Sequence, residues 1–199
     1  NRVTVGIDDT VDVKKYPPVG LPNIASAESS GVTRTISGQT YGNGSYKIEF
    51  SSSYDNWTPP NLFEGNTNHA GGHSDYNTYD TNGYAIDTTK YVGNDSENFG
   101  EWISLELPER IYISYLKLYQ RSEFESRSPE IYIVYGTNDN INWDKIYMEN
   151  NASYTSLIHT SGYIYPVTSY KKYLLLIKKI FLTGSNNNYN FSEIEFFGT

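Results

Sequence analysis

The stretch GEWISLELPERIYISYLKLYQRSEFESRSPEIYIVYGTNDNINW, residues 100–143, decides the fold class. It contains three apolar runs of strand length, and each alternates its side chains along at least part of its length, as a half-buried strand does. A Pro-Glu-Arg turn and a polar loop separate these runs, with no helix between them. Consecutive strands joined by short turns predict antiparallel pairing, so the chain is predicted to be all-β. The runs are 102–107, 111–119 and 131–135.

Further strands are predicted on both sides of this stretch. Residues 46–52 form one of them, with Tyr46, Ile48 and Phe50 on the core face. Residues 145–148 and the very apolar run 172–181 follow Trp143, and turn clusters rich in Gly and Asn separate the runs. Strands at these spacings are typical of a sandwich.

The same stretch carries a resemblance to a known family. The order of its motifs, Gly-Glu-Trp-Ile at 100–103, LPERIYIS at 107–114, Arg121 and SPEIYIVYGTNDNINW at 128–143, resembles the discoidin family, the C-type domains of coagulation factors. Galactose-binding-like carbohydrate modules share this pattern. The closing run FSEIEFFG at 191–198 is similar to the family's last strand. The resemblance implies an antiparallel jelly-roll β-sandwich with about eight core strands.

The N-terminal part of the chain differs from the rest. Residues 1–38 include a tandem Pro17-Pro18, which forbids a central strand, and a run of small residues. We predict an extended arm or linker at 1–38, in which 32–36 adds an edge strand, and a sandwich domain at 39–199. The arm together with Tyr41-Gly42-Asn43-Gly44 also resembles discoidin-like domains in structural proteins of large DNA viruses and phages.

Charge and composition exclude several classes of partner. The net charge is −8 and the pI is near 4.8, which argues against nucleic acid, because its binding rests on clustered Lys and Arg. Adsorption to an anionic membrane is disfavoured for the same reason. The chain contains no Cys, so it holds neither a disulfide nor a thiolate metal site.

No pattern in the chain predicts catalysis. No nucleophile elbow occurs, and the carboxylate pairs Glu123/Glu125 and Glu193/Glu195 are more typical of solvated edges than of acid–base catalysts. The chain is therefore predicted not to be an enzyme and to have no catalytic residues.

The family resemblance implies a structural Ca²⁺ site. In the family, a loop reading Asp-Gly-Asn meets a Glu of the closing strand and supplies oxygen ligands. The matching side chains here belong to a loop after residue 62 and to the closing strand. Two further residues would contribute their carbonyl oxygens as ligands. Glu64 replaces the usual Asp, and an ordinary Glu64-Gly65 turn is the alternative. The implied set is Glu64, Asn66, Thr67 and Glu193, with the carbonyls of Phe63 and Ser192.

A sugar site is implied by the same resemblance. Glycan binding needs an aromatic face for the apolar side of the sugar ring and planar donors for its hydroxyls. Arg121 matches the family's binding arginine, His73 its loop histidine and Tyr189, beside Asn188, its stacking aromatic. Ser126 falls where the family has an Asn. The alternatives are a surface ion pair of Arg121 with Glu123 or Glu125 and a merely exposed Tyr189.

These observations predict a non-catalytic recognition module. Its loops at one end of the sandwich bind carbohydrate on a cell surface or glycoprotein, within a larger adhesive or fibrous assembly that brings protein partners. The expected location is extracellular or on a virion surface. The alternative is a purely structural module of a virion or cell-surface protein that makes protein contacts and binds no sugar. A third possibility, a glycoside hydrolase fragment, requires turnover of a glycoside.

Overall fold

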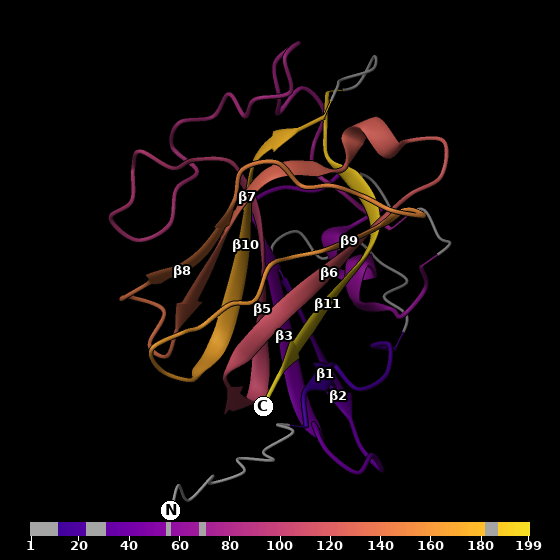
Figure 1. The fold of residues 1–199 in the computed structure, drawn as a ribbon, viewed down its shortest axis with the longest axis vertical. Coiled ribbons are helices and arrows are strands. Elements are labelled where there is room, and N and C mark those ends of the chain that lie inside the picture. The colour runs from indigo at the N-terminus through magenta and orange to yellow at the C-terminus, as the bar shows by residue number, and fades with distance from the viewer. Residues whose placement is uncertain (1–11, 23–30, 55–56, 68–70, 182–186) are drawn as a thin grey trace, which may run out of the picture.

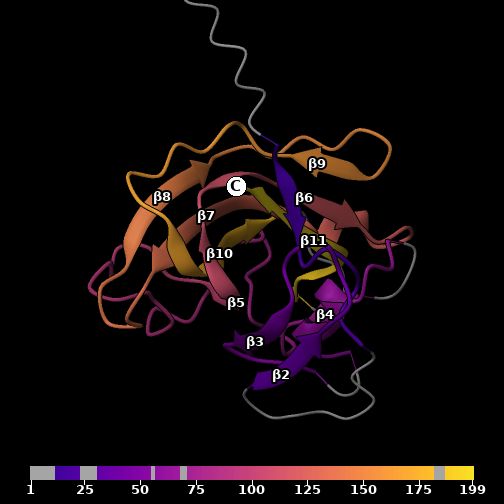
Figure 2. The same ribbon diagram turned by 90° about the horizontal axis from the view of Figure 1, so that it is seen from below.

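The computed structural model describes residues 12–22, 31–54, 57–67, 71–181 and 187–199. Within these residues two antiparallel β-sheets pack against each other, which confirms the predicted all-β sandwich. Figure 1 shows β9, β6 and β11 in front of the longer strands of the second sheet, and Figure 2 shows both sheets from below. No helix among the described residues is long and apolar enough to cross a lipid bilayer.

The larger sheet has six described strands in the order β2-β3-β5-β10-β7-β8. All of its neighbouring strands run antiparallel. The strands are β2 (Gly31–Ile36), β3 (Gly44–Phe50), β5 (Glu101–Ile111), β10 (Tyr170–Ile180), β7 (Pro129–Thr137) and β8 (Asp144–Glu149).

The smaller sheet has five described strands in the order β1-β11-β6-β9, with β4 pairing to β11. Two short 3-10 helices, η1 (Pro59–Phe63) and η2 (Glu125–Arg127), lie in the connections. The strands are β1 (Lys14–Tyr16), β4 (Gly72–His73), β6 (Ile113–Gln120), β9 (Ile158–Thr160) and β11 (Asn190–Gly198).

The core between the sheets follows the predicted alternation. Ile103, Leu105 and Leu107 of β5 are buried in it, whereas Trp102 packs on the opposite face of the strand. The predicted core face of β3 is confirmed in the same way, because its Tyr46, Ile48 and Phe50 are buried. Strand β10 is buried on both faces, which explains why it reads as a nearly continuous apolar run.

The predicted pairing of consecutive strands is wrong for all three runs, because β6 lies in the smaller sheet while β5 and β7 lie in the larger one, separated by β10. β5 continues through the expected Pro-Glu-Arg turn to Ile111, and β6 then begins in the other sheet. The chain changes sheet at Tyr112, whose backbone exchanges hydrogen bonds of 2.8 Å and 3.0 Å with Thr199. An irregular register between Ile113 and Tyr115 then shifts the buried phase, so that Leu116 and Leu118 of β6 face the core. This corner depends on the far end of the chain, which local alternation does not report.

The N-terminal residues contribute a strand to each sheet. β2 pairs with β3 over its whole length, as predicted for an added edge strand. β1 was not predicted; it lies at the edge of the smaller sheet and pairs with β11, where the edge position tolerates the Pro17 that follows. Residues 1–11 and 23–30 of the predicted arm lie outside the described part of the chain, and the division at residue 38 stays a prediction.

Candidate functional site

The candidate site lies at one end of the sandwich, here called the loop pole. It is formed by the C-terminal end of β6 with η2, by β4 and by the start of β11, in the upper part of Figure 1. Strand pairing holds these segments together, because Phe191 pairs with both Gly72 of β4 and Gln120 of β6. Chain segments more than a hundred residues apart therefore meet at this pole on rigid strands rather than on free loops.

Two of the predicted sugar-binding residues meet at the loop pole. His73 ends β4, and Arg121 directly follows β6. Arg121 Nη1 lies 3.5 Å from His73 Nε2, a long hydrogen bond in which the guanidinium is the donor when Nε2 carries no proton. Two planar polar groups are thus brought side by side, as the recognition of neighbouring sugar hydroxyls requires.

Aromatic rings flank this polar pair. The Trp57 ring lies 6.2 Å from the His73 ring at an interplanar angle of 20°. The Arg121 guanidinium lies over the Phe124 ring, 4.3 Å from its centroid. Neither aromatic was predicted to belong to the site. The only sequence signal for them is their place in the loops that carry or precede the predicted polar residues.

Tyr189 and Asn188 do not face a ligand, which corrects their predicted roles. Both side chains are fully buried, at 0% exposure. The Asn188 amide is used within the protein, since its Nδ2 donates to the Ser74 carbonyl at 3.2 Å and its Oδ1 accepts from Arg127 at 3.2 Å. Tyr189 packs against Phe191 in the core, so it has no free ring face for a sugar. An Asn-rich neighbourhood suggested an exposed loop, but the segment already leads into β11.

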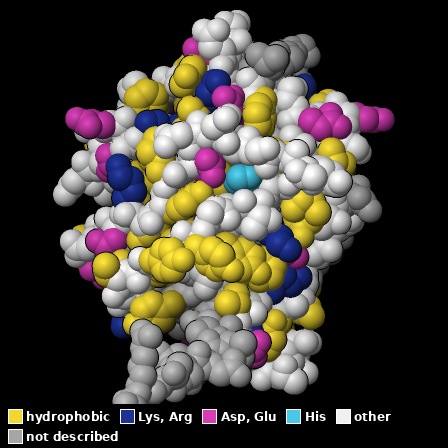
Figure 3. Space-filling model, viewed as in Figure 1, with side chains coloured by type: hydrophobic (Ala, Val, Ile, Leu, Met, Phe, Trp, Pro, Cys, Tyr) yellow, Lys and Arg dark blue, Asp and Glu magenta, His cyan; other side chains and the backbone are white. Residues whose placement is uncertain are grey.

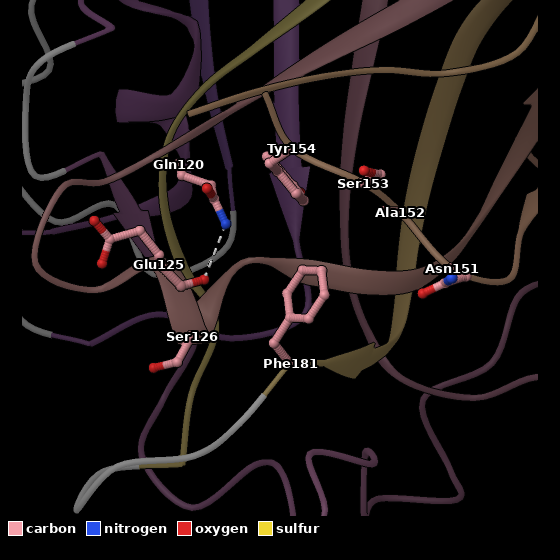
Figure 4. A pocket seen from close by; sticks show the side chains of 8 residues that line it. All are labelled: Gln120, Glu125, Ser126, Asn151, Ala152, Ser153, Tyr154 and Phe181. Atoms are coloured by element: carbon pink, nitrogen blue, oxygen red, sulfur yellow. Dashed lines mark hydrogen bonds between the residues drawn. The ribbon is translucent and has the colours of Figure 1, made fainter. Parts of the chain in front are cut away.

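Ser126 lines a pocket whose wall also includes Gln120, the residue before Arg121. The pocket has a volume of about 500 Å³, and Figure 4 shows the Phe181 and Tyr154 rings in its middle, with Gln120 on one side and Asn151 on the other. The Gln120 amide donates to the Glu125 carbonyl of η2 at 3.2 Å. Aromatic rings with amide and hydroxyl groups around them suit a small polar ligand with an apolar face, and this volume lies in the usual range for ligand sites. Ser126 is an exposed residue of this pocket.

The residues of the implied Ca²⁺ site are partly brought together. Glu193 of β11 reaches the loop after η1, where its Oε1 accepts a hydrogen bond of 3.0 Å from the Gly65 backbone N–H. Its Oε2 is buried with no hydrogen-bond partner among the described residues. Burial raises the pKa of Glu193 to about 9. A buried carboxyl group with such a raised pKa is either protonated or neutralised by a bound cation.

Other members of that set fit less closely. The Phe63 carbonyl already accepts a hydrogen bond of 2.8 Å from Leu21 N–H, so the N-terminal arm competes for it. Ser192 lies next to Glu193 on β11, and its hydroxyl donates to the Gln120 carbonyl at 3.3 Å. Glu64 is half-buried, and Asn66 and Thr67 are exposed in the same loop. The described residues contain no group of three or more His, Asp or Glu side chains that could hold a metal ion.

A separate aromatic surface lies on the outer face of the smaller sheet. Tyr115 stacks on Phe197 with ring centroids 4.6 Å apart, and Tyr163 and Tyr165 continue the row at 6.2 Å per step. Tyr163 and Tyr165 are 69% and 83% exposed, and Figure 3 shows a hydrophobic band across this face. The paired residues Tyr115 and Phe197 lie at the end of β6 and β11 opposite to the loop pole. This surface is therefore not part of the candidate site.

Comparison with known proteins was informative at the level of structure. No family model matches the chain, and no curated protein matches it. A carbohydrate-binding module of a family 31 glycoside hydrolase from Clostridium perfringens superposes with a TM-score of 0.57 at 15% identity, covering 76% of this chain and 91% of that module. The chain has the fold of these modules.

Two further solved structures share this fold. The family 32 module of NanJ from C. perfringens, solved in complex with galactose, gives a TM-score of 0.54 at 12% identity, covering 76% of this chain and 93% of that one. A fucose-binding module from Streptococcus pneumoniae gives 0.51 at 13% identity, covering 76% and 90%. These neighbours are galactose-binding-like domains of the discoidin type. Identities this low establish the fold and leave the ligand to be argued from the site.

Proposed function

We propose that this chain is a non-catalytic carbohydrate-binding module that holds a glycan at the loop pole. The observation that carries this proposal is the contact between His73 and Arg121, because segments distant in sequence are fixed there with their polar atoms 3.5 Å apart. The Trp57 and Phe124 rings beside them supply apolar surface for the C–H face of a sugar. The galactose complex of the NanJ module, which has the same fold, supports a glycan as the ligand.

The pocket beside η2 extends the proposed site. Its wall includes Gln120, the residue before Arg121, and its Gln120, Ser126 and Asn151 offer amide and hydroxyl groups. A glycan longer than one sugar could place its first ring at His73 and Arg121 and its next ring against Phe181 and Tyr154. We assign the terminal sugar to the arginine because planar donors fix orientation more strictly than single hydroxyls.

We also propose that Ca²⁺ stabilises the loop after η1. The unpartnered Oε2 of Glu193 supports this, because a hard cation would supply the missing partner for a buried carboxylate. The ligands would be Glu193, Glu64, Asn66 and Thr67 with the Ser192 carbonyl, and the Phe63 carbonyl would be shared with Leu21. The ion would hold the loop and the closing strand together without contacting the glycan.

A glycan array tests the proposed function. The protein is expected to bind a subset of glycans saturably, and Arg121→Ala should weaken that binding by about 10-fold to 100-fold, because a charge-assisted hydrogen bond contributes about 1.5–3 kcal/mol. The matched control is Arg110→Ala, which should leave binding unchanged. Arg110 is exposed near the C-terminal end of β5, away from the loop pole. Absence of binding across the array, or equal losses in both variants, would contradict the proposal.

The expected setting is a cell surface or an extracellular assembly. The neighbours that share the fold are carbohydrate-binding modules, several of them from glycoside hydrolases, and they give no support to the alternative of a purely structural virion module. Attachment to a larger protein is part of this proposal.

A further inference from the structure

Arg127 is a second arginine at the loop pole, and it is nearly enclosed. It ends η2 and is only 8% exposed. Its Nη1 donates to the Asn188 Oδ1 at 3.2 Å, and its guanidinium lies 4.9 Å from the centroid of the Phe124 ring. None of its nitrogen atoms is both sealed from solvent and without a partner. Its remaining donors are therefore open to the surface.

Arg121 and Arg127 share the Phe124 ring and have no acidic partner. The Arg121 guanidinium lies 4.3 Å from the same ring centroid. No carboxylate of the described residues lies within ion-pair distance of either arginine, although most other described cations are paired. Buried charges in proteins are usually paired, because desolvation of an isolated charge is costly. Two adjacent arginines without an acidic partner depart from this rule, and a bound anion would supply the missing partner.

The surrounding charges agree with this interpretation. Burial lowers the pKa of Arg127, the neighbouring Arg121 charge acts in the same direction, and Tyr76 opposes them; the guanidinium nonetheless stays charged at any physiological pH. The nearest acids along the chain, Glu123 and Glu125, are exposed. The Glu125 carboxylate accepts from the Glu123 backbone N–H at 3.2 Å and not from an arginine. Among the described residues, neither arginine is therefore paired with these acids, although the chain has a net charge of −8.

We propose that the glycan bound at the loop pole is acidic, and that its carboxylate or sulfate group is held by Arg121 and Arg127. This inference rests on the proposed carbohydrate-binding function and narrows it to one class of sugar. The guanidinium fork matches a carboxylate or sulfate with two parallel hydrogen bonds, which a neutral hydroxymethyl group cannot accept. Asn188 and Phe124 already hold Arg127 in place, so little side-chain freedom is lost when the anion binds.

Matched ligands isolate the charge of the sugar from its shape. We would measure affinities by calorimetry for methyl α-galacturonide, for its neutral methyl ester and for methyl α-galactoside, each at low and high salt. The acid is expected to bind about 10-fold to 100-fold more tightly than its ester at low salt, and added salt should reduce this preference. Galactose 6-sulfate and sialyllactose, compared with galactose and lactose, distinguish a sulfate from a carboxylate as the preferred anion.

Variants assign the preference to the two arginines. Arg121→Gln should lower the ratio of acid to ester affinity by about tenfold, and Arg127→Lys should lower it while keeping the net charge. Arg110→Gln, which removes the same charge elsewhere, should leave the ratio unchanged. Melting curves show whether each variant folds. Arg121 is only half-buried, so Arg121→Gln is expected to fold. This variant alone therefore tests the inference if Arg127→Lys unfolds.

The outcomes separate this inference from the function on which it rests. Equal affinity for the acid and the ester would overturn the acidic specificity and leave a neutral carbohydrate-binding module. No binding of any sugar would overturn both. Binding to phosphatidylserine vesicles without binding to acidic sugars would likewise overturn the inference, because the arginines would then serve a lipid headgroup.

Discussion

The free energy of unfolding of the metal-free protein is expected to fall as the pH rises from 4.5 to about 9, the usual and the folded-state pKa of Glu193. Burial raises this pKa, so in that window the folded protein keeps a proton that the unfolded chain releases. Stability falls with pH wherever the folded state binds more protons, by at most about 1.4 kcal/mol per pH unit for one group. Below the unfolded pKa the contribution is fully present, and above about 9 it is lost.

Glu193→Gln isolates this effect. The amide resembles the protonated carboxyl, so the variant should match the wild type near pH 5 and exceed it in stability near pH 8 when a chelator is present. Urea unfolding at a series of pH values measures both proteins, with the exposed Glu97→Gln as the control. A wild-type stability that does not depend on pH, or a variant less stable than the wild type at pH 8, would show that Glu193 does not titrate as described.

Calcium should reverse this dependence. Ca²⁺ binds the ionised carboxylate, so its binding releases a proton and strengthens as the pH rises toward about 9. At a calcium concentration 100 times the dissociation constant, the folded state should gain about 2.7 kcal/mol. Glu193→Gln should lose this gain. If Ca²⁺ leaves the melting temperature of the wild type unchanged at pH 8, the proposed calcium site is wrong.

Removal of the buried Glu101 carboxylate is expected to destabilise the fold by about 3 kcal/mol or more. Glu101 is 1% exposed on the larger sheet, and it accepts hydrogen bonds from Ser51 and Ser52 and from Lys90, the last at 2.5 Å. Ser52 Oγ in turn accepts from the Asp75 backbone N–H at 3.1 Å, two residues after His73. This carboxylate therefore holds three connections in place, one of which leads to the candidate site.

Glu101→Ala leaves the Lys90 ammonium and two hydroxyl groups without their acceptor. Urea unfolding should show the loss, whereas Glu97→Ala, in the exposed loop before β5, should change stability by no more than about 0.5 kcal/mol. The double variant Glu101→Ala/Lys90→Ala should recover part of the loss, because it also removes the unpaired cation. A loss below about 1 kcal/mol in Glu101→Ala would contradict the buried ion pair.

Local alternation predicted the layers of the fold but not the path of the chain between them. Ile103, Leu105 and Leu107 report which face of β5 is buried because side-chain direction has a period of two in any strand. The change of sheet at Tyr112 depends instead on backbone hydrogen bonds to Thr199. No window of neighbouring residues contains both partners. The extra edge strand β1 escaped prediction for the same reason, since its pairing partner is β11.

Arg121 and His73 were predicted from the resemblance to the discoidin family and not from a local pattern, because the loop sequence around His73 has no periodicity. Arg121 and His73 both lie at strand ends that strand pairing brings to one pole. The prediction that Tyr189 stacks on a sugar was wrong because the exposure of a tyrosine depends on its packing. The Asn-rich sequence around Tyr189 suggested an exposed loop, whereas the side chain is buried. Arg127 and Phe124 were missed because η2 is too short to give a periodic pattern, although Arg127 stands only six residues after Arg121.

The most direct test of the loop-pole site is a nuclear magnetic resonance titration of the histidine imidazoles with a glycan that binds on the array. His73 touches Arg121, whereas His159 of β9 is buried and bonded to Tyr132 at 2.8 Å and to the Ser153 carbonyl at 2.9 Å. The account predicts that the His73 signals shift in a saturable manner while those of His159 stay in place. Saturable glycan binding that leaves the His73 signals unchanged would contradict it.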